Sequence, residues 1–156
     1  MENPAEPRFI ADVMVGRLAR WLRIAGFDVL YSNSFEDDEI IAISRRDGRI
    51  ILTRDRGLEA RVAPREVVLV QDDDYESQLR QVLEKFPRQN VQLFSRCPEC
   101  NGDLVPVDKE TVFERIPPYV YLTQDEFARC TQCDRVYWHG THAGAMERKL
   151  SGFDGL

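Results

Sequence analysis

Long apolar runs are absent from this chain of 156 residues. None approaches the roughly 20 residues that a helix needs to cross a bilayer, so we expect no integral membrane segment and no membrane partner. The first eight residues are polar and lack the apolar core of a signal peptide. GxGxxG, GxxxxGK[S/T] and GxSxG motifs are also missing, which argues against the common nucleotide cradles and a serine-hydrolase elbow.

Cysteine is scarce, and its placement is informative. The four cysteines form two CxxC pairs, Cys97 with Cys100 and Cys130 with Cys133, and none is left over. Two such turns supply four sulfurs to one tetrahedral Zn²⁺. A disulfide framework would require an oxidising compartment, and a redox CxxC would leave the second pair unexplained. We therefore predict a structural, coordinatively closed zinc site in a protein of a reducing, cytoplasmic compartment.

Lysine is nearly missing as well. It occurs only at positions 85, 109 and 149, so arginine makes up eighteen of the 21 basic residues. A planar guanidinium suits phosphate recognition, although clustered arginines are equally compatible with solvated helix faces. The formal net charge is −6, which as a total repels nucleic acid and is typical of a protein that concentrates divalent cations.

Apolar segments and amphipathic segments alternate in the first ninety residues. Strands are expected at 8–12, 28–31, 49–53 and 66–70, and helices at 15–25, 37–46 and 74–86, the second starting at Asp37 or Asp38. This alternation predicts an α/β domain over residues 8–90, built on a parallel sheet with helices on both faces. We expect the outer face of the first helix to carry Arg17, Arg20 and Arg23.

The pattern changes after a linker-like stretch at residues 87–90. Short β-like runs surround the cysteine pairs, at 111–113, 119–122 and 135–138. We therefore predict a second, β-rich zinc-ribbon domain over residues 91–150.

Acidic residues follow the strands of the predicted sheet. Asp12 ends the first strand, Asp55 lies two residues beyond the third, and residues 72–74 are all aspartate. Asp37 and Asp38 begin a helix whose N-terminus faces the same edge. Ligands gather at this edge in open α/β sheets, and carboxylates that converge there repel one another unless a hard cation such as Mg²⁺ or Mn²⁺ binds. Taken singly, each acid is as readily explained as a helix cap.

Several stretches, spread over most of the chain, carry a family resemblance. They are residues 9–23 (FIADVMVGRLARWLR), 37–41 (DDEII), 48–56 (GRIILTRDR), the four cysteines and 137–142 (YWHGTH). With these, residues 8–148 resemble the Mut-seven C-terminal RNase family, in which a PIN-like nuclease domain precedes a zinc ribbon. The step from Thr53 to Asp55 is similar to the Thr-x-Asp motif that PIN-like domains place after a core strand.

The resemblance implies metal-dependent cleavage of RNA phosphodiesters by clustered acids. Asp12 and Asp55 match the metal-binding aspartates of the family pattern. The acid at the helix start is Asp37 or Asp38, and we favour Asp37. The last acid of the pattern is one of Asp72, Asp73 and Asp74, or none of them.

The leading hypothesis is an RNA endonuclease that uses one or two Mg²⁺ or Mn²⁺ ions. Asp12, Asp37 and Asp55 would bind the ions, and Thr53 would orient a water or an acid. The partner would be single-stranded or structured RNA. Phosphate contacts are expected from Arg17, Arg20 and Arg54, and further RNA contacts on the ribbon from Arg129, Arg135 and Trp138.

Two other functions stay open at this point. A non-catalytic nucleic-acid- or protein-binding module would retain a degenerate PIN-like site whose acids are only helix caps. A zinc-dependent enzyme would use His139 and His142, whose H-x-x-H spacing fits two ligands of an open zinc site but lacks a clear third ligand nearby.

Overall fold

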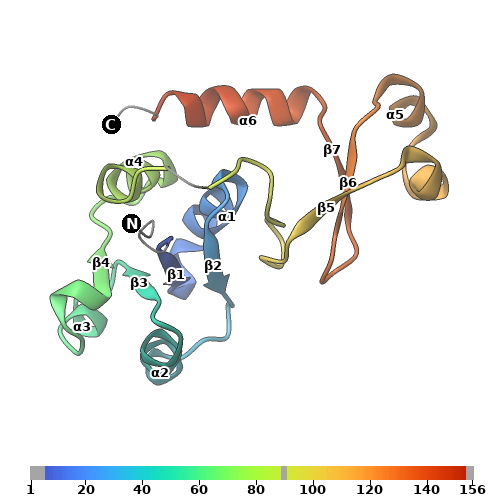
Figure 1. Cartoon of the computed structure of the whole chain (residues 1–156). Coiled ribbons are helices and arrows are strands. Elements are labelled where there is room, and N and C mark those ends of the chain that lie inside the picture. The colour runs from blue at the N-terminus through green and yellow to red at the C-terminus, as the bar shows by residue number, and fades with distance from the viewer. Residues whose placement is uncertain (1–5, 89–90, 154–156) are drawn as a thin grey trace, which may run out of the picture.

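The chain forms two separate sheets in the computed structural model (Figure 1), which describes residues 6–88 and 91–153, with only the backbone of Thr141 and His142. Four parallel strands in the order β2-β1-β3-β4 form the larger sheet, and three antiparallel strands in the order β5-β6-β7 form the smaller one. Figure 1 shows the smaller sheet standing to one side of the helix-covered larger sheet. The predicted fold class, a parallel α/β sheet followed by a small β-rich module with four cysteines, is confirmed.

The elements of the larger sheet follow the predicted order. The strands are β1 (Arg8–Ala11), β2 (Asp28–Tyr31), β3 (Ile50–Thr53) and β4 (Val67–Leu69). The helices are α1 (Gly16–Ala25), α2 (Asp37–Asp47), α3 (Arg56–Glu59) and α4 (Tyr75–Lys85), with 3₁₀ turns η1 (Val13–Val15) and η2 (Pro64–Glu66). The short helix α3 was not predicted. In the described part of the chain, no helix combines the length and the apolar character that crossing a membrane requires.

The apolar strands are buried on both faces of the sheet. Successive residues of β1 alternate between two core clusters, because side chains of a strand point to opposite faces. Phe9 and Ala11 pack with α1 and α4 on one face, whereas Ile10 packs with α2 and α3 on the other. A parallel sheet covered in this way needs continuous apolar strands, which is the pattern that predicted it.

One expectation for α1 is wrong. Arg23 does not lie on the outer face with Arg17 and Arg20, because its side chain is buried, with 5% of its surface exposed. Its Nε donates to the Val29 carbonyl at 2.8 Å and an Nη donates to the Pro98 carbonyl at 3.0 Å. The loop that contains Pro98 covers this end of the helix, so Arg23 links α1 to the cysteine-bearing module.

The smaller sheet consists of β5 (Leu104–Val107), β6 (Phe127–Cys130) and β7 (Val136–Trp138). The predicted β-like run at 135–138 is therefore a strand, but the runs at 111–113 and 119–122 are not. They lie in the 3₁₀ helix η3 (Lys109–Arg115) and in α5 (Pro118–Thr123). Apolar residues four apart, Val112, Ile116 and Val120, form one buried cluster with Phe127. Val112 lies in η3, Val120 in α5 and Ile116 in the extended link between them. Their joint burial against Phe127, with a proline at the start of α5, overrides the β propensity of the individual residues.

An unpredicted helix, α6 (Thr141–Ser151), follows the smaller sheet. Figure 1 shows it running back above α1 and α4. Leu150, in its last turn, and Phe153, just beyond it, are buried in the same cluster as the strands and helices of the larger sheet. The boundary between residues 90 and 91 stays a prediction, and residues 89 and 90 of the expected linker lie outside the described residues.

A hydrogen-bond network joins the cysteine-bearing loop to β2, the edge strand of the parallel sheet. Asn101 accepts from the Val29 amide at 2.9 Å and donates to an Asp28 carboxylate oxygen at 2.6 Å. Arg49, also buried, donates to the same Asp28 oxygen at 2.8 Å and to the Phe9 carbonyl at 3.0 Å. Burial opposes ionisation of Asp28, but the hydrogen bonds from Arg49 and Asn101 outweigh it and lower the Asp28 pKa. The edge of the sheet is thus covered rather than left open.

Candidate active site and metal centres

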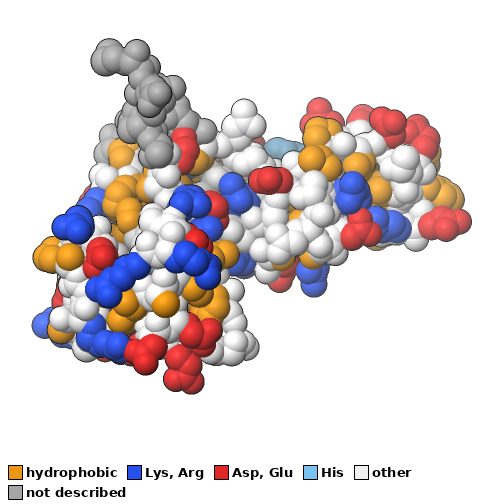
Figure 2. All heavy atoms as spheres, turned by 60° about the horizontal axis from the view of Figure 1, so that its bottom comes forward, with side chains coloured by type: hydrophobic (Ala, Val, Ile, Leu, Met, Phe, Trp, Pro, Cys, Tyr) orange, Lys and Arg blue, Asp and Glu red, His pale blue; other side chains and the backbone are white. Residues whose placement is uncertain are grey.

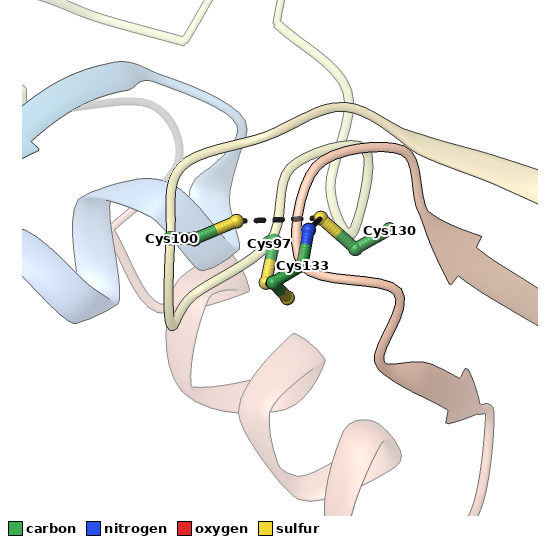
Figure 3. Close-up of side chains that lie close together, drawn as sticks. All are labelled: Cys97, Cys100, Cys130 and Cys133. Carbon is green, nitrogen blue, oxygen red and sulfur yellow. Dashed lines mark hydrogen bonds between the residues drawn. The ribbon is translucent and has the colours of Figure 1, made fainter.

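The four cysteines lie on two facing loops, as Figure 3 shows. Cys97 and Cys100 precede β5, Cys130 ends β6, and Cys133 lies in the turn to β7. The Sγ atoms of Cys97 and Cys133 are 3.7 Å apart, and those of Cys100 and Cys130 are 3.3 Å apart. A tetrahedral zinc ion with Zn–S bonds of roughly 2.3 Å requires sulfurs about 3.8 Å apart. The cluster therefore fits zinc.

Backbone amides of the two loops point at the sulfurs. The Gly102 amide donates to Cys100 Sγ, and the amides of Gln132 and Cys133 donate to Cys130 Sγ, each at 3.4 Å. Such hydrogen bonds stabilise thiolates. A Cβ at Gly102 would lie 2.7 Å from the Gln132 Cβ and 3.0 Å from Cys130 Sγ, so glycine is required for the loops to approach.

The thiols differ in how readily they ionise. Burial raises the pKa of Cys100 to about 12. Burial acts on Cys133 in the same direction, but hydrogen bonds from the backbone and side chain of Arg135 outweigh it, and its pKa is lowered to about 6. Arg135 therefore supports the charge of the cluster.

Three aspartates converge at the carboxyl edge of the parallel sheet. Asp12 directly follows β1, Asp55 lies two residues beyond the neighbouring strand β3, and Asp37 begins α2. One carboxylate oxygen from each lies within 4.8 Å of one from each of the others. Two adjacent parallel strands end at the same edge, and α2 begins beside them, so residues distant in the sequence meet here.

Thr53 links two of these aspartates. Its hydroxyl donates to Asp12 Oδ2 at 2.8 Å and accepts from the Asp55 amide at 2.9 Å. The other oxygen of Asp12 accepts from the Val13 amide at 2.7 Å. Asp55 caps α3 through Oδ1, which accepts from the Gly57 amide at 2.7 Å. Both carboxylates are therefore held in fixed orientations.

The three carboxylates of this group are not paired directly with a cation in the described part of the chain, although Arg61 lies close enough to act on Asp37 electrostatically. Among the described residues, no lysine or arginine forms an ion pair with Asp12, Asp37 or Asp55. Three carboxylates at this separation repel one another, and a hard divalent cation such as Mg²⁺ or Mn²⁺ with oxygen ligands relieves the repulsion. The donor set fits such an ion. Asp12 and Asp55 also cap the helices that follow them, η1 and α3. The two interpretations of these acids, metal ligand and helix cap, are therefore compatible.

The remaining candidate acids lie outside this group. Asp38, which is 86% exposed, forms an ion pair with Arg61 instead. Asp74 caps α4 by accepting from the Ser77 amide at 2.9 Å. Neither Asp72 nor Asp73 belongs to the cluster in the part of the chain that the structure describes. The geometry thus separates Asp37 from its neighbour Asp38 and leaves three acids together.

The cluster lines an open pocket of about 520 Å³. Five carboxylate side chains, two apolar residues of η1, an aromatic ring and a guanidinium surround it: Asp12, Glu36, Asp37, Asp38, Asp55, Val13, Met14, Phe35 and Arg61. Arg61 was not assigned to the site from the sequence. Arg61 is one of several arginines that follow β3 in the sequence, and nothing in that run indicates that its side chain contacts Asp38 at the pocket.

The arginines predicted to hold phosphate have different surroundings. Arg17 is exposed, and its guanidinium carbon lies 3.9 Å from the centroid of the Tyr75 ring. Arg20 is paired with Glu99 of the cysteine-bearing loop. The Nε of Arg54 is buried and has no hydrogen-bond partner among the described residues. Figure 2 shows Lys and Arg side chains interspersed with Asp and Glu on the face that it draws, rather than one continuous basic patch.

His139 lies apart from both clusters. Its Nε2 is 3.6 Å from a Glu147 oxygen, and its ring packs edge-on against Phe94 with centroids 5.3 Å apart. The side chain of His142 lies outside the described residues. No group of three metal ligands in the described part of the chain includes His139, so nothing there supports an open zinc site.

Taken together, these features define an α/β protein with an acidic cluster at the carboxyl edge of a parallel sheet and a four-cysteine module beside it. Comparison with known families gives a match to the Mut7-C RNAse domain over residues 7–150. The match covers most of the chain, and the chain belongs to this family. A search among curated proteins found no match.

Proposed function

We propose that this protein is a metal-dependent endonuclease that cleaves RNA phosphodiester bonds at the Asp12–Asp37–Asp55 cluster. The observation that carries the proposal is the convergence of these three carboxylates within 4.8 Å, none of them in a direct ion pair with a lysine or arginine of the described residues. Membership in an RNase family supports the same activity. The four-cysteine cluster would hold structural zinc.

The residues of the site have distinct roles in this proposal. Asp12, Asp37 and Asp55 would hold Mg²⁺ or Mn²⁺, which when bound supplies activation of water and stabilises charge on the phosphate. The Thr53 hydroxyl donates a hydrogen bond to Asp12, so Thr53 would orient that carboxylate rather than donate to RNA. The hydrogen bond from Gly57 fixes Asp55 in the same way. Carboxylates oriented beforehand do not have to reorganise when substrate arrives.

A route for flanking RNA leads from the cluster along α1. Met14 lines both the acidic pocket and a second pocket of about 340 Å³ that includes Arg17 and Tyr75. Trp21 stacks on Tyr75, with ring centroids 5.6 Å apart and ring planes inclined by 16°. Arginine beside aromatic rings is the combination that holds phosphates and unstacked bases of single strands. Asp73, Asp74 and Glu76 also line this second pocket, so Arg17 and the two aromatic rings, rather than the pocket as a whole, are the features that support single-stranded RNA as the substrate.

The direct test is cleavage of a short labelled single-stranded RNA with Mn²⁺, and again with EDTA. We expect cleavage only with Mn²⁺, and a fall in kcat of at least about 10²-fold for Asp12→Asn and Asp55→Asn. Asp125→Asn removes a carboxylate from the exposed surface of the other module and should cleave like the wild type. Equal cleavage by all four proteins would indicate a contaminating nuclease and refute the proposal.

A non-catalytic RNA-binding module is the second candidate. It is favoured by the position of residues 72–74, which contribute no fourth acid to the cluster among the described residues. A protein that binds Mn²⁺ through Asp12 and Asp55 and binds RNA, yet leaves the RNA intact, would establish this function instead.

A further inference from the structure

Arg61 is the single cation among the described residues that line the acidic pocket. It lies just after α3, and its amide donates to the Leu58 carbonyl at 3.1 Å, which continues the turn of that helix. Its side chain extends to the start of α2, where it is hydrogen-bonded to Asp38 Oδ1. One long side chain therefore spans the mouth of the pocket between the two helices.

The pocket presents a problem for a phosphate. Five carboxylates line it, and a divalent cation neutralises only part of that charge. A phosphodiester that approaches Asp12, Asp37 and Asp55 needs a second positive group on its other side. A guanidinium fits this requirement, because its planar array of donors matches two phosphate oxygens.

The present partner of Arg61 is a weak competitor for that phosphate. Both members of the pair are open to solvent, with 48% of the Arg61 side chain and 86% of the Asp38 side chain exposed. Ion pairs of this kind stabilise a fold little, because water screens them and two side chains lose freedom. Exchange of Asp38 for a phosphate oxygen therefore costs little, and the flexible arginine stem allows the movement.

We propose that Arg61 binds the RNA phosphate at this site and that Asp38 holds Arg61 at the mouth of the pocket until RNA arrives. The inference rests on the proposed nuclease function. It gives Asp37 and Asp38 different roles, since Asp37 binds the cation and Asp38 only positions Arg61. The competing explanation is that the ion pair between Arg61 and Asp38 only holds α2 and α3 together.

Four variants separate these roles in the cleavage assay with Mn²⁺. Arg61→Ala should lower kcat/KM by about 10²-fold, and Arg61→Lys should recover part of the loss, because lysine keeps the charge without the planar donors. Asp38→Asn should keep Mn²⁺ affinity and kcat and raise KM, because Arg61 loses the carboxylate that holds it at the pocket. Arg65→Ala, an exposed arginine outside the pocket, is the matched control. Wild-type kinetics for Arg61→Ala, or loss of Mn²⁺ binding in Asp38→Asn, would overturn the inference.

A binding measurement separates failure of this inference from failure of the nuclease function. In the Asp12→Asn background, which the nuclease proposal predicts to be inactive, RNA affinity is followed by fluorescence anisotropy across a salt series. Addition of Arg61→Ala should weaken binding several-fold and reduce the salt slope by about 0.7, the value for one lost contact to a single strand. An unchanged slope overturns the role of Arg61 even if the wild type cleaves RNA. If the wild type does not cleave RNA, only the proposed nuclease function is refuted.

Discussion

Replacement of Asn101 should show how firmly the cysteine-bearing module is joined to the parallel sheet. Its side chain accepts from the Val29 amide and donates to the Asp28 carboxylate. Loss of the first contact leaves a buried amide of the edge strand without a partner, at a cost of about 1–3 kcal/mol. Loss of the second removes a hydrogen bond to a charged group, worth about 1.5–3 kcal/mol.

These two losses are not expected to add in full. Asp28 is only partly buried and keeps its contact with Arg49, so water and the arginine compensate for part of the second loss. We therefore expect Asn101→Gly to lower the free energy of unfolding by about 3 kcal/mol. Asn101 has a φ of +72°, which alanine adopts at a cost of about 1 kcal/mol more than glycine. Asn101→Ala should then lose about 4 kcal/mol.

Urea unfolding at pH 7 with zinc in the buffer measures these differences. Zinc content is determined for each variant, because position 101 directly follows Cys100 and a metal defect would imitate the predicted loss. Asn33→Gly, the same substitution in the exposed loop between β2 and α2, is the control and should lie within about 0.5 kcal/mol of the wild type. An Asn101→Gly protein equally close to the wild type would refute the reasoning.

Three further outcomes are expected. Cys97→Ser should abolish zinc binding and collapse the NMR signals of the antiparallel sheet to random-coil positions, whereas unchanged signals would mean that zinc does not hold this sheet together. Arg17→Ala should weaken binding of single-stranded RNA and flatten the salt dependence of binding at unchanged stability. Arg23→Ala should chiefly lower stability, because Arg23 is buried. Equal RNA binding by Arg17→Ala and the wild type would contradict this expectation. The lowered pKa of Asp28 stabilises the fold at pH values above about 3.9, its unfolded pKa, and this contribution is lost as pH falls through the folded pKa. Asp28→Asn should therefore be less stable than the wild type at pH 7, and the difference should shrink in acid.

The parallel sheet could be predicted because its signals are local. Four apolar runs alternate with amphipathic segments, and Asp12 and Asp55 end up together because neighbouring parallel strands end at the same edge. The choice between Asp37 and Asp38 is different. Consecutive helical residues point about 100° apart, so which of them faces the cluster depends on how α2 docks on the sheet, and no local pattern contains that information.

Residues whose environment comes from distant parts of the chain could not be predicted. Arg23 has the spacing of a solvent-facing arginine, and only the loop around Pro98 buries it. Arg61 belongs to a run of arginines in the sequence, and only its contact with Asp38 in the fold places it at the pocket. Helix α6 contains Gly144 and few apolar residues, so its buried contacts through Leu150 come from the core of the other sheet. In each case tertiary packing outweighs local propensity.

The burial of Leu150 and Phe153 beside residues such as Phe9 has a consequence for the order in which the protein is made. Synthesis runs from the N-terminus, so the ribosome releases the four parallel strands, then the cysteine loops, and only afterwards the two residues that complete the first core. The nascent chain therefore carries an open apolar surface over α1 and α4 while residues 97–133 already contain every cysteine. The four-cysteine module can fold first, and the core of the parallel sheet is completed only after the ribosome has synthesised that module.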